Sequence, residues 1–122
     1  MTLNQVIRDA YVTWHGVMLN EPDWRPFSHT VAFTVWSPEG EVLVHVILNA
    51  YWEPLAFELP PLPQGHGPWR RWIDTFLDPP DDIIDWMQAP LVAGTTYQAQ
   101  PRSVVALIAA VAPQRPVGMD AA

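Results

Sequence analysis

Hydrophobic and polar residues alternate with a period of two along much of this 122-residue chain. The segments TVAFTVW at 30–36 and VLVHVIL at 42–48 each place an apolar residue at every second position, which is typical of β-strands. In the second segment Leu43 and Ile47 add apolar residues on the other face, beside His45. This pattern predicts a central strand that is covered on both sides.

The same periodicity, interrupted by Pro- and Gly-rich turn signals, predicts further strands. The expected strands are residues 11–19, 30–36, 41–49, 55–59, 69–77, 95–100 and 103–111. Short strands without alternating helices favour an all-β fold, an antiparallel β-sandwich of about seven to eight strands. We therefore expect one β-sandwich domain over residues 11–112.

Helical spacing is limited to two short stretches. In residues 1–10, the apolar residues Leu3, Val6, Ile7 and Ala10 fall on one helical face and predict a short N-terminal helical segment. Residues 81–87 follow Pro79-Pro80 with an acidic start, which predicts one helical turn. Residues 113–122 contain two prolines and a glycine and little to bury, so we expect a flexible tail.

Charge and composition exclude several classes of function. The net charge is −7 and the six basic residues are scattered arginines, so no basic stripe is present for nucleic acid. The chain has no cysteine, which excludes disulfides and thiolate metal sites. The N-terminus lacks a signal-peptide pattern and no apolar run is long enough to span a membrane. We expect a cytoplasmic protein.

The sequence contains no convincing catalytic or metal-binding constellation. Four aspartates gather at 78–85, but their position favours capping of a helical turn over cation binding. The four histidines fit no zinc spacing, and His45 is expected to be a hydrogen-bonded structural residue or a surface residue. We therefore expect no metal, no cofactor and no enzymatic activity.

Seven tryptophans are the most distinctive chemical resource of the chain. Indole rings suit stacking on sugars as well as packing in a core. Trp24, Trp52 and Trp86 lie in or near proline-containing loops and are the candidate carbohydrate-binding residues, and Trp36 at a strand end is a further candidate for an exposed platform. Packing or domain contact is the alternative role for all of them.

Five motifs in a fixed order resemble the C-terminal all-β domain of glycogen debranching enzymes and isoamylases, in the α-amylase superfamily. They are VTWHGVMLNEPDW at 12–24, SHTVAFTV at 28–35, LNAYWEPLAFELPPLP at 48–63, WRRWIDTFL at 69–77 and TYQAQPRSVVALI at 96–108. The resemblance covers roughly residues 11–110 and implies a Greek-key β-sandwich. It also implies that Trp14, Trp69, Asn49, the Asp74-Thr75 pair and the Arg102-Ser103 pair are fold determinants.

In the resembled enzymes the chemistry resides in a (β/α)8 barrel that precedes this domain. A barrel needs about 250 residues, more than this chain contains. The resemblance therefore implies a non-catalytic accessory or interaction domain in storage-glucan metabolism, with an apolar face where the barrel would pack. The partner would be a second copy of the chain, giving a homodimer, or a glucan-metabolising enzyme. The alternatives are a stand-alone α-glucan-binding module and a fragment of a split debranching-enzyme gene.

Overall fold

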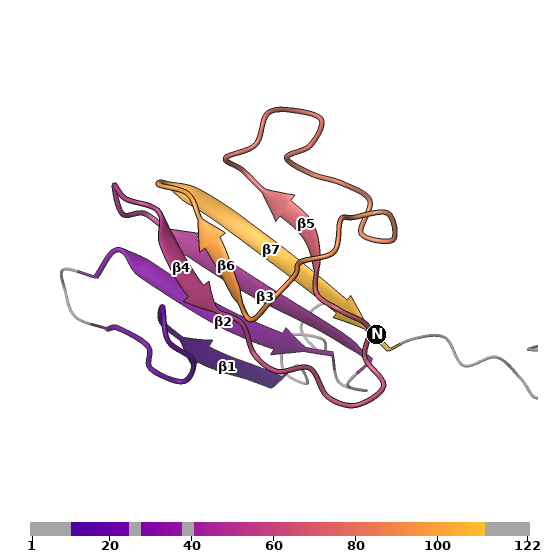
Figure 1. Ribbon diagram of the computed structural model, residues 1–122. Helices are drawn as coiled ribbons and strands as arrows, with labels where there is room; N and C mark the ends of the chain where they lie inside the picture. Colours follow the sequence, from indigo (N-terminus) through magenta and orange to yellow (C-terminus); the bar gives the residue numbers. More distant parts are fainter. Residues whose placement is uncertain (1–10, 25–27, 38–40, 112–122) are drawn as a thin grey trace, which may run out of the picture.

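A computed structural model describes residues 11–24, 28–37 and 41–111 as two antiparallel sheets. The strands are β1 (Tyr11–His15), β2 (Thr30–Trp36), β3 (Val42–Asn49), β4 (Leu55–Glu58), β5 (Arg70–Asp74), β6 (Thr96–Ala99) and β7 (Ser103–Ala110). The larger sheet has the order β1-β2-β3-β7-β5, and β4 pairs with β6 in the smaller sheet. Figure 1 shows β4 and β6 lying over one face of the larger sheet.

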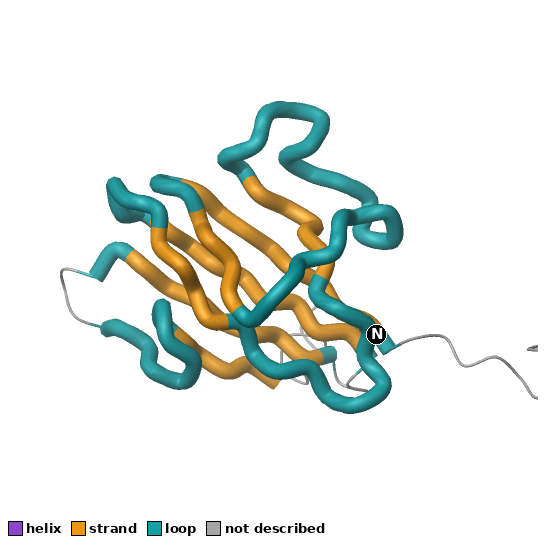
Figure 2. Tube along the Cα trace, viewed as in Figure 1, coloured by secondary structure: helices purple, strands orange, loops and turns teal. Residues whose placement is uncertain are grey.

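This arrangement confirms the predicted all-β, antiparallel sandwich. Within the described residues the chain is strand, loop and turn (Figure 2), and no helix there is long and apolar enough to cross a membrane. The order in which a Greek key would connect the strands stays a prediction. The expected helical segment at 1–10 and the expected tail at 113–122 lie outside the described residues.

The core lies between the two sheets. The second face of β3, predicted from its alternation, contributes Leu43 and Ile47, and β7 contributes Val105 and Leu107. Phe57 from β4 is fully buried against them. β3 is the central strand, as predicted, because it pairs with β2 on one side and with β7 on the other. Its opposite face is only partly buried, so the expected cover on both sides is absent within the described residues.

Asn49 ends β3 and connects three loop carbonyls. Its side-chain amide donates to the carbonyl oxygens of Glu53, Ala99 and Gln100 at 3.1, 3.1 and 3.2 Å, and its Oδ1 accepts the N–H of Tyr51 at 3.0 Å. The residue is 1% exposed. Asn49 is therefore a fold determinant, as the resemblance implied, and it acts by satisfying backbone groups of the loops.

Three other predicted fold determinants, Asp74, Thr75 and Ser103, also form hydrogen bonds that hold neighbouring segments together. Asp74 accepts the Phe76 N–H at 3.1 Å, and the hydroxyl of Tyr97 donates to its other oxygen. Burial and the Asp74 carboxylate raise the pKa of Tyr97 above its usual range. Thr75 Oγ1 accepts the Val104 N–H at 2.9 Å and Ser103 Oγ donates to the Gln100 carbonyl at 2.8 Å.

The predicted first strand, 11–19, is shorter in the structure because the chain turns after His15. At Gly16 an added Cβ would lie 2.5 Å from the carbonyl oxygen of Glu21, so only glycine fits this close backbone approach. The Gly16 N–H donates to the Met18 carbonyl at 3.2 Å, which closes the turn.

The helical turn predicted at 81–87 is wrong. This stretch extends along the free edge of β5: the Asp74 N–H donates to the Asp82 carbonyl at 2.9 Å and the Ile84 N–H to the Trp72 carbonyl at 3.0 Å. Ile73 and Ile83 form an antiparallel bridge. Hydrogen bonds from the edge strand therefore outweigh the local preference of the aspartates for a helix start.

The strict alternation predicted for 69–77 is also wrong. The strand spans Arg70–Asp74 only, and its register against β7 shifts between Arg71 and Ile73. Such a bulge places an extra residue in one strand and reverses the alternation beyond it. As a result, Arg70 and Ile73 pair with Ile108 and Ala106, which share one face of β7.

Candidate functional site

The face of the larger sheet that points away from β4 and β6, which we call the outer face, is apolar from β1 to β7. Its members are Val12, Trp14, Val31, Phe33, Val35, Val42, Val44, Val46, Leu48, Val104, Ala106, Ile108 and Ala110. Most of these side chains are partly or fully exposed, and only Ala106 and Ile108 are buried. A solvent-facing antiparallel sheet usually carries polar residues, so this face has the composition of a contact surface.

Strand register explains why the outer face is continuous. Trp14 pairs with Phe33, which pairs with Val46, which pairs with Ala106. Because side chains alternate across each strand, aligning these positions aligns every second residue of the four strands on one side. On the neighbouring strand β5, Arg70 pairs with Ile108 of the outer face, and its Nη1 donates to the Ala89 carbonyl at 2.9 Å.

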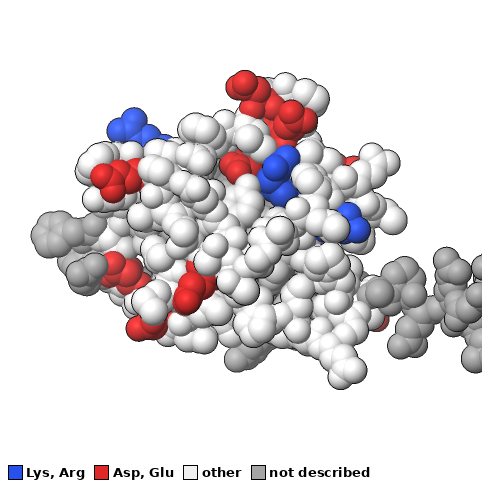
Figure 3. Space-filling model, in the orientation of Figure 1, with Lys and Arg blue, Asp and Glu red and all other residues white. Residues whose placement is uncertain are grey.

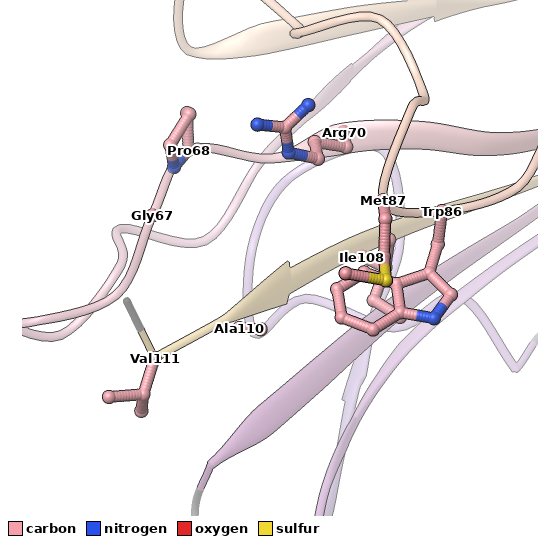
Figure 4. Close-up of a pocket in the computed structure, with 8 residues that line it drawn as sticks. All are labelled: Gly67, Pro68, Arg70, Trp86, Met87, Ile108, Ala110 and Val111. Atoms are coloured by element: carbon pink, nitrogen blue, oxygen red, sulfur yellow. The ribbon is translucent and has the colours of Figure 1, made fainter. Parts of the chain in front are cut away.

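One end of the outer face, near Ala110, contains a pocket of about 410 Å³. The residues that line it are Gly67, Pro68, Arg70, Trp86, Met87, Ile108, Ala110 and Val111 (Figure 4). Trp86 and Met87 come from the connection between β5 and β6, and their side chains lie against Ile108 of β7 in the close-up. Apart from the Arg70 guanidinium, the side chains that line this pocket are apolar.

The opposite end of the outer face contains a second, smaller pocket. It has a volume of about 300 Å³ and is lined by Leu48, Asn49, Ala50, Arg102, Ser103 and Val104. Val104 is 40% exposed there. Arg102 has a backbone φ of 54°, and its N–H donates to the Tyr51 carbonyl at 3.2 Å.

The three candidate carbohydrate-binding tryptophans are exposed and have separate surroundings. Trp24 (63% exposed) packs edge-on against Trp14, with ring centroids 5.3 Å apart, and Trp52 (65% exposed) lies 5.4 Å from the Tyr51 ring. Trp86 (37% exposed) lines the larger pocket. Their exposure agrees with the prediction, but among the described residues no ring contact joins them into one platform.

Two other tryptophan predictions have different outcomes. Trp69 is buried, as expected for a structural residue, and its Nε1 donates to the Pro60 carbonyl at 3.1 Å. Trp36 packs against the core, so its prediction as an exposed platform is wrong. Side chains alternate along β2, so Trp36 points to the same side as Ala32 and Thr34, which is the side that faces the core.

Trp14 was expected to be structural, yet 46% of its surface is exposed. It lies on the outer face, where its ring is 5.2 Å from that of Phe33. Its exposure was missed because the sequence around Trp14 carries no signal of which face of β1 is covered. The position of Trp14 in the register, opposite Phe33, is the observation that assigns it to the outer face.

The acidic residues do not form a cation site. Figure 3 shows red side chains over the connection between β5 and β6, where Asp78, Asp81, Asp82 and Asp85 occur in sequence. Asp85 Oδ1 accepts the Met87 N–H at 3.0 Å. Within residues 11–24, 28–37 and 41–111, no three His, Asp or Glu side chains gather as metal ligands.

A chain of buried hydrogen bonds crosses the interior beneath β1, β2 and β3. The Asn20 N–H donates to His15 Nδ1 at 2.8 Å, so the proton of neutral His15 is on Nε2, which donates to Thr34 Oγ1 at 3.1 Å. Thr34 Oγ1 also forms a hydrogen bond of 2.9 Å with His45 Nδ1. Burial, and to a lesser extent the neighbouring His15, lowers the pKa of His45 to about 4. The prediction of His45 as a hydrogen-bonded structural residue is confirmed.

Fold and surface together define the class of this protein: a two-layer antiparallel β-sandwich domain with one apolar face left partly exposed. The chain matches the family model described as Isoamylase 1-3, C-terminal, over residues 13–109. Because the match covers most of the chain, the chain belongs to this family, as its motifs suggested. A search of curated proteins found no match.

Proposed function

We propose that this chain is a non-catalytic accessory domain in storage-glucan metabolism that docks through its outer face onto an α-glucan-metabolising enzyme. The observation that carries the proposal is the uncharged, partly exposed outer face. Membership of the isoamylase C-terminal family supports the metabolic context. In that context the partner with a matching apolar surface is a catalytic barrel, and a second copy of the chain is the competing occupant.

The docking proposal predicts that one added charge on the outer face weakens binding. The probe is the catalytic barrel of an isoamylase expressed without its own C-terminal domain, titrated with this chain in an interferometry experiment. We expect saturable binding by the unmodified chain and at least a tenfold loss for Val104→Glu, because burying an unpaired carboxylate is costly. Gln98→Glu, on an exposed position of β6, is the matched control and is expected to bind normally.

Light scattering over a range of protein concentrations separates the two occupants. A monomer that binds the barrel supports the docking proposal. A dimer that dissociates on Val104→Glu, with no barrel binding, would replace the enzyme partner by a second copy. Equal binding of Val104→Glu and the unmodified chain would contradict the use of the outer face.

A stand-alone α-glucan-binding function is the second candidate, and the contact between exposed Trp52 and half-buried Tyr51 favours it. The two rings lie 5.4 Å apart, and Arg102, bonded to the Tyr51 carbonyl through its N–H, lines the pocket of about 300 Å³ nearby. An aromatic platform beside a donor-bearing pocket suits a neutral sugar.

The glucan-binding candidate predicts a saturable change in tryptophan fluorescence on titration with maltoheptaose and with glycogen. Trp52→Ala is expected to weaken this binding about tenfold, since a stacked ring contributes about 1 kcal/mol or more. Trp24→Ala and Trp86→Ala test the other two candidates, which lie in other surroundings. No fluorescence change at millimolar sugar in the unmodified chain would exclude this function.

A further inference from the structure

The larger pocket has apolar walls and one cationic side chain. Trp86 and Met87 form one part of its wall and are 37% and 69% exposed, and Ile108 forms another part. Among the described residues that line it, Arg70 is the only charged one. Figure 4 shows its guanidinium on the side of the pocket towards Pro68, whereas Trp86 and Met87 lie beside Ile108. Exposed apolar side chains around a hollow of about 410 Å³ are typical of a binding site for a largely apolar group.

Most of the N–H donors of Arg70 are available to a ligand. Its Nη1 donates to the Ala89 carbonyl at 2.9 Å, and no carboxylate forms an ion pair with it in the part of the chain that the structure describes. Asp85, from the same connection as Trp86, accepts the Met87 N–H at 3.0 Å instead. A guanidinium has five N–H donors, and two of them in parallel match the two oxygens of a carboxylate. In a chain of net charge −7, an arginine without such a partner favours an anionic group from outside.

The residue types around the pocket favour a protein as the source of this group. Trp, Met and Arg are enriched in the cores of protein–protein interfaces, and Trp and Arg are frequent among the residues that carry most of the binding energy. Met side chains are flexible, so they adapt to the shape of an inserted side chain. The pocket also includes Ile108 and Ala110 of the outer face, so it is continuous with the proposed docking surface.

We infer that the larger pocket is the anchor point of the docking surface and takes an apolar side chain of the partner enzyme that lies next to an Asp or Glu. The apolar side chain packs between Trp86, Met87 and Ile108, and the carboxylate accepts two N–H groups of Arg70. The identity of the partner rests on the proposed function. The preference of the pocket for an apolar carboxylate is a property of this chain alone, so it is tested without the partner.

A small carboxylic acid tests the chemistry of the pocket. The full chain is labelled with 5-fluorotryptophan, and the fluorine NMR signal of Trp86 is assigned from the variant Trp86→Phe. Titration with 3-phenylpropionate is expected to shift the Trp86 signal with a Kd on the order of millimolar, as for other ligands of about eleven non-hydrogen atoms. The uncharged 3-phenylpropanol is the matched control and is expected to bind at least about fivefold more weakly. The signals of Trp24 and Trp52, which do not line the pocket, are expected to stay unchanged.

Substitution of Arg70 separates ligand binding from a structural role. Arg70→Gln is expected to abolish the difference in affinity between the acid and the alcohol, because glutamine carries no charge. Arg70→Lys is expected to retain part of it, because lysine keeps the charge but not the paired donors. If Arg70 only held the Ala89 carbonyl, both probes would lose affinity equally and their ratio would not change. An unchanged ratio in Arg70→Gln, a Trp86 signal that does not move, or equal binding of the two probes by the unmodified chain would each overturn the inference.

The barrel titration then tests the role of the pocket in docking. Saturating 3-phenylpropionate, and separately Arg70→Gln, are expected to weaken binding of the isoamylase barrel at least about fivefold. Barrel binding that neither change affects would show that the pocket is not the anchor point, even where Val104→Glu still weakens binding and the proposed function stands. If the unmodified chain binds no barrel, the proposed function and this partner are both wrong, and the Trp86 titration separately decides the chemistry of the pocket.

Discussion

Replacing Asn49 with aspartate is expected to lower the free energy of unfolding by at least about 4 kcal/mol, enough to prevent stable folding of a marginal domain. The amide group of Asn49 donates to three carbonyl oxygens, those of Glu53, Ala99 and Gln100. Aspartate has nearly the same shape but no donors when ionised, so it would place a buried carboxylate against three acceptors. Each lost bond costs about 1 kcal/mol, and each carbonyl left unpaired adds about 1–3 kcal/mol.

The measurement is urea denaturation followed by tryptophan fluorescence at pH 7.5. Asn49→Ala is expected to be less damaging than the aspartate, because it removes the donors without burying a charge. Gln98→Glu makes the same amide-to-carboxylate change at an exposed position of β6 and is expected to change stability by less than about 0.5 kcal/mol. If Asn49→Asp unfolded at the same urea concentration as this control, the connection of three loops by Asn49 would not be essential.

The outcome at Asn49 illustrates what a single sequence can predict. A polar residue that ends an apolar strand before a loop has to bond to backbone groups if it is buried, so its type of role follows from local pattern. Its partners do not follow, because Ala99 and Gln100 are about 50 residues away in sequence. Only the pairing of β3 with β7 brings them together.

The strands of the larger sheet were also predictable from local pattern. Alternation in residues 30–36 and 42–48 assigned each side chain to a face, and the observed register of β2 with β3 keeps those assignments. Alternation sorted the residues onto the two faces of the sheet, but it did not indicate which of these faces the smaller sheet covers. That choice decides that Leu43 and Ile47 are core and that Val44 and Val46 lie on the outer face.

The errors concentrate where an edge strand or a bulge overrides local preference. Residues 81–87 have good helix-start chemistry, yet β5 offers a free edge with unpaired backbone groups, and the segment bonds there. The bulge between Arg71 and Ile73 reverses an alternation that was correct up to that point. Neither event leaves a signal in the sequence of the segment itself.

The hydrogen-bonded chain from His15 to His45 could not be predicted from the spacing of these residues in the sequence. His15, Thr34 and His45 belong to three strands, and they meet because Thr34 pairs with His45 and lies two residues from Ala32, the partner of His15. His45 is fully buried, and its Nε2 has no hydrogen-bond partner among the described residues. Its ring lies 5.6 Å from that of His15 and 5.9 Å from that of Trp69. This arrangement keeps His45 neutral and makes the fold sensitive to acid.

Lowering the pH from 7.5 to 5.5 is expected to destabilise the domain by roughly 1 kcal/mol through His45 alone. In the unfolded chain His45 has a pKa near 6.5, and burial lowers the pKa in the folded state to about 4. Between these values the unfolded state binds the proton and the folded state does not, so stability is full above pH 6.5 and falls as the pH drops towards 4. Burial also lowers the pKa of His15, which adds in the same direction.

The measurement is thermal unfolding at pH 7.5 and 5.5, a window in which most carboxylates stay ionised. For a domain of this size, a loss of roughly 1 kcal/mol corresponds to a fall in Tm of about 4 °C. The double variant Thr34→Val with His45→Phe removes the titrating ring and its hydrogen-bond partner together, because Thr34 Oγ1 would otherwise lose that partner. It is expected to lose most of this pH dependence, whereas His29→Gln, at an exposed position, keeps it. An unchanged difference in Tm between the two pH values in the double variant would show that other groups, and not the buried histidine, make the fold sensitive to acid.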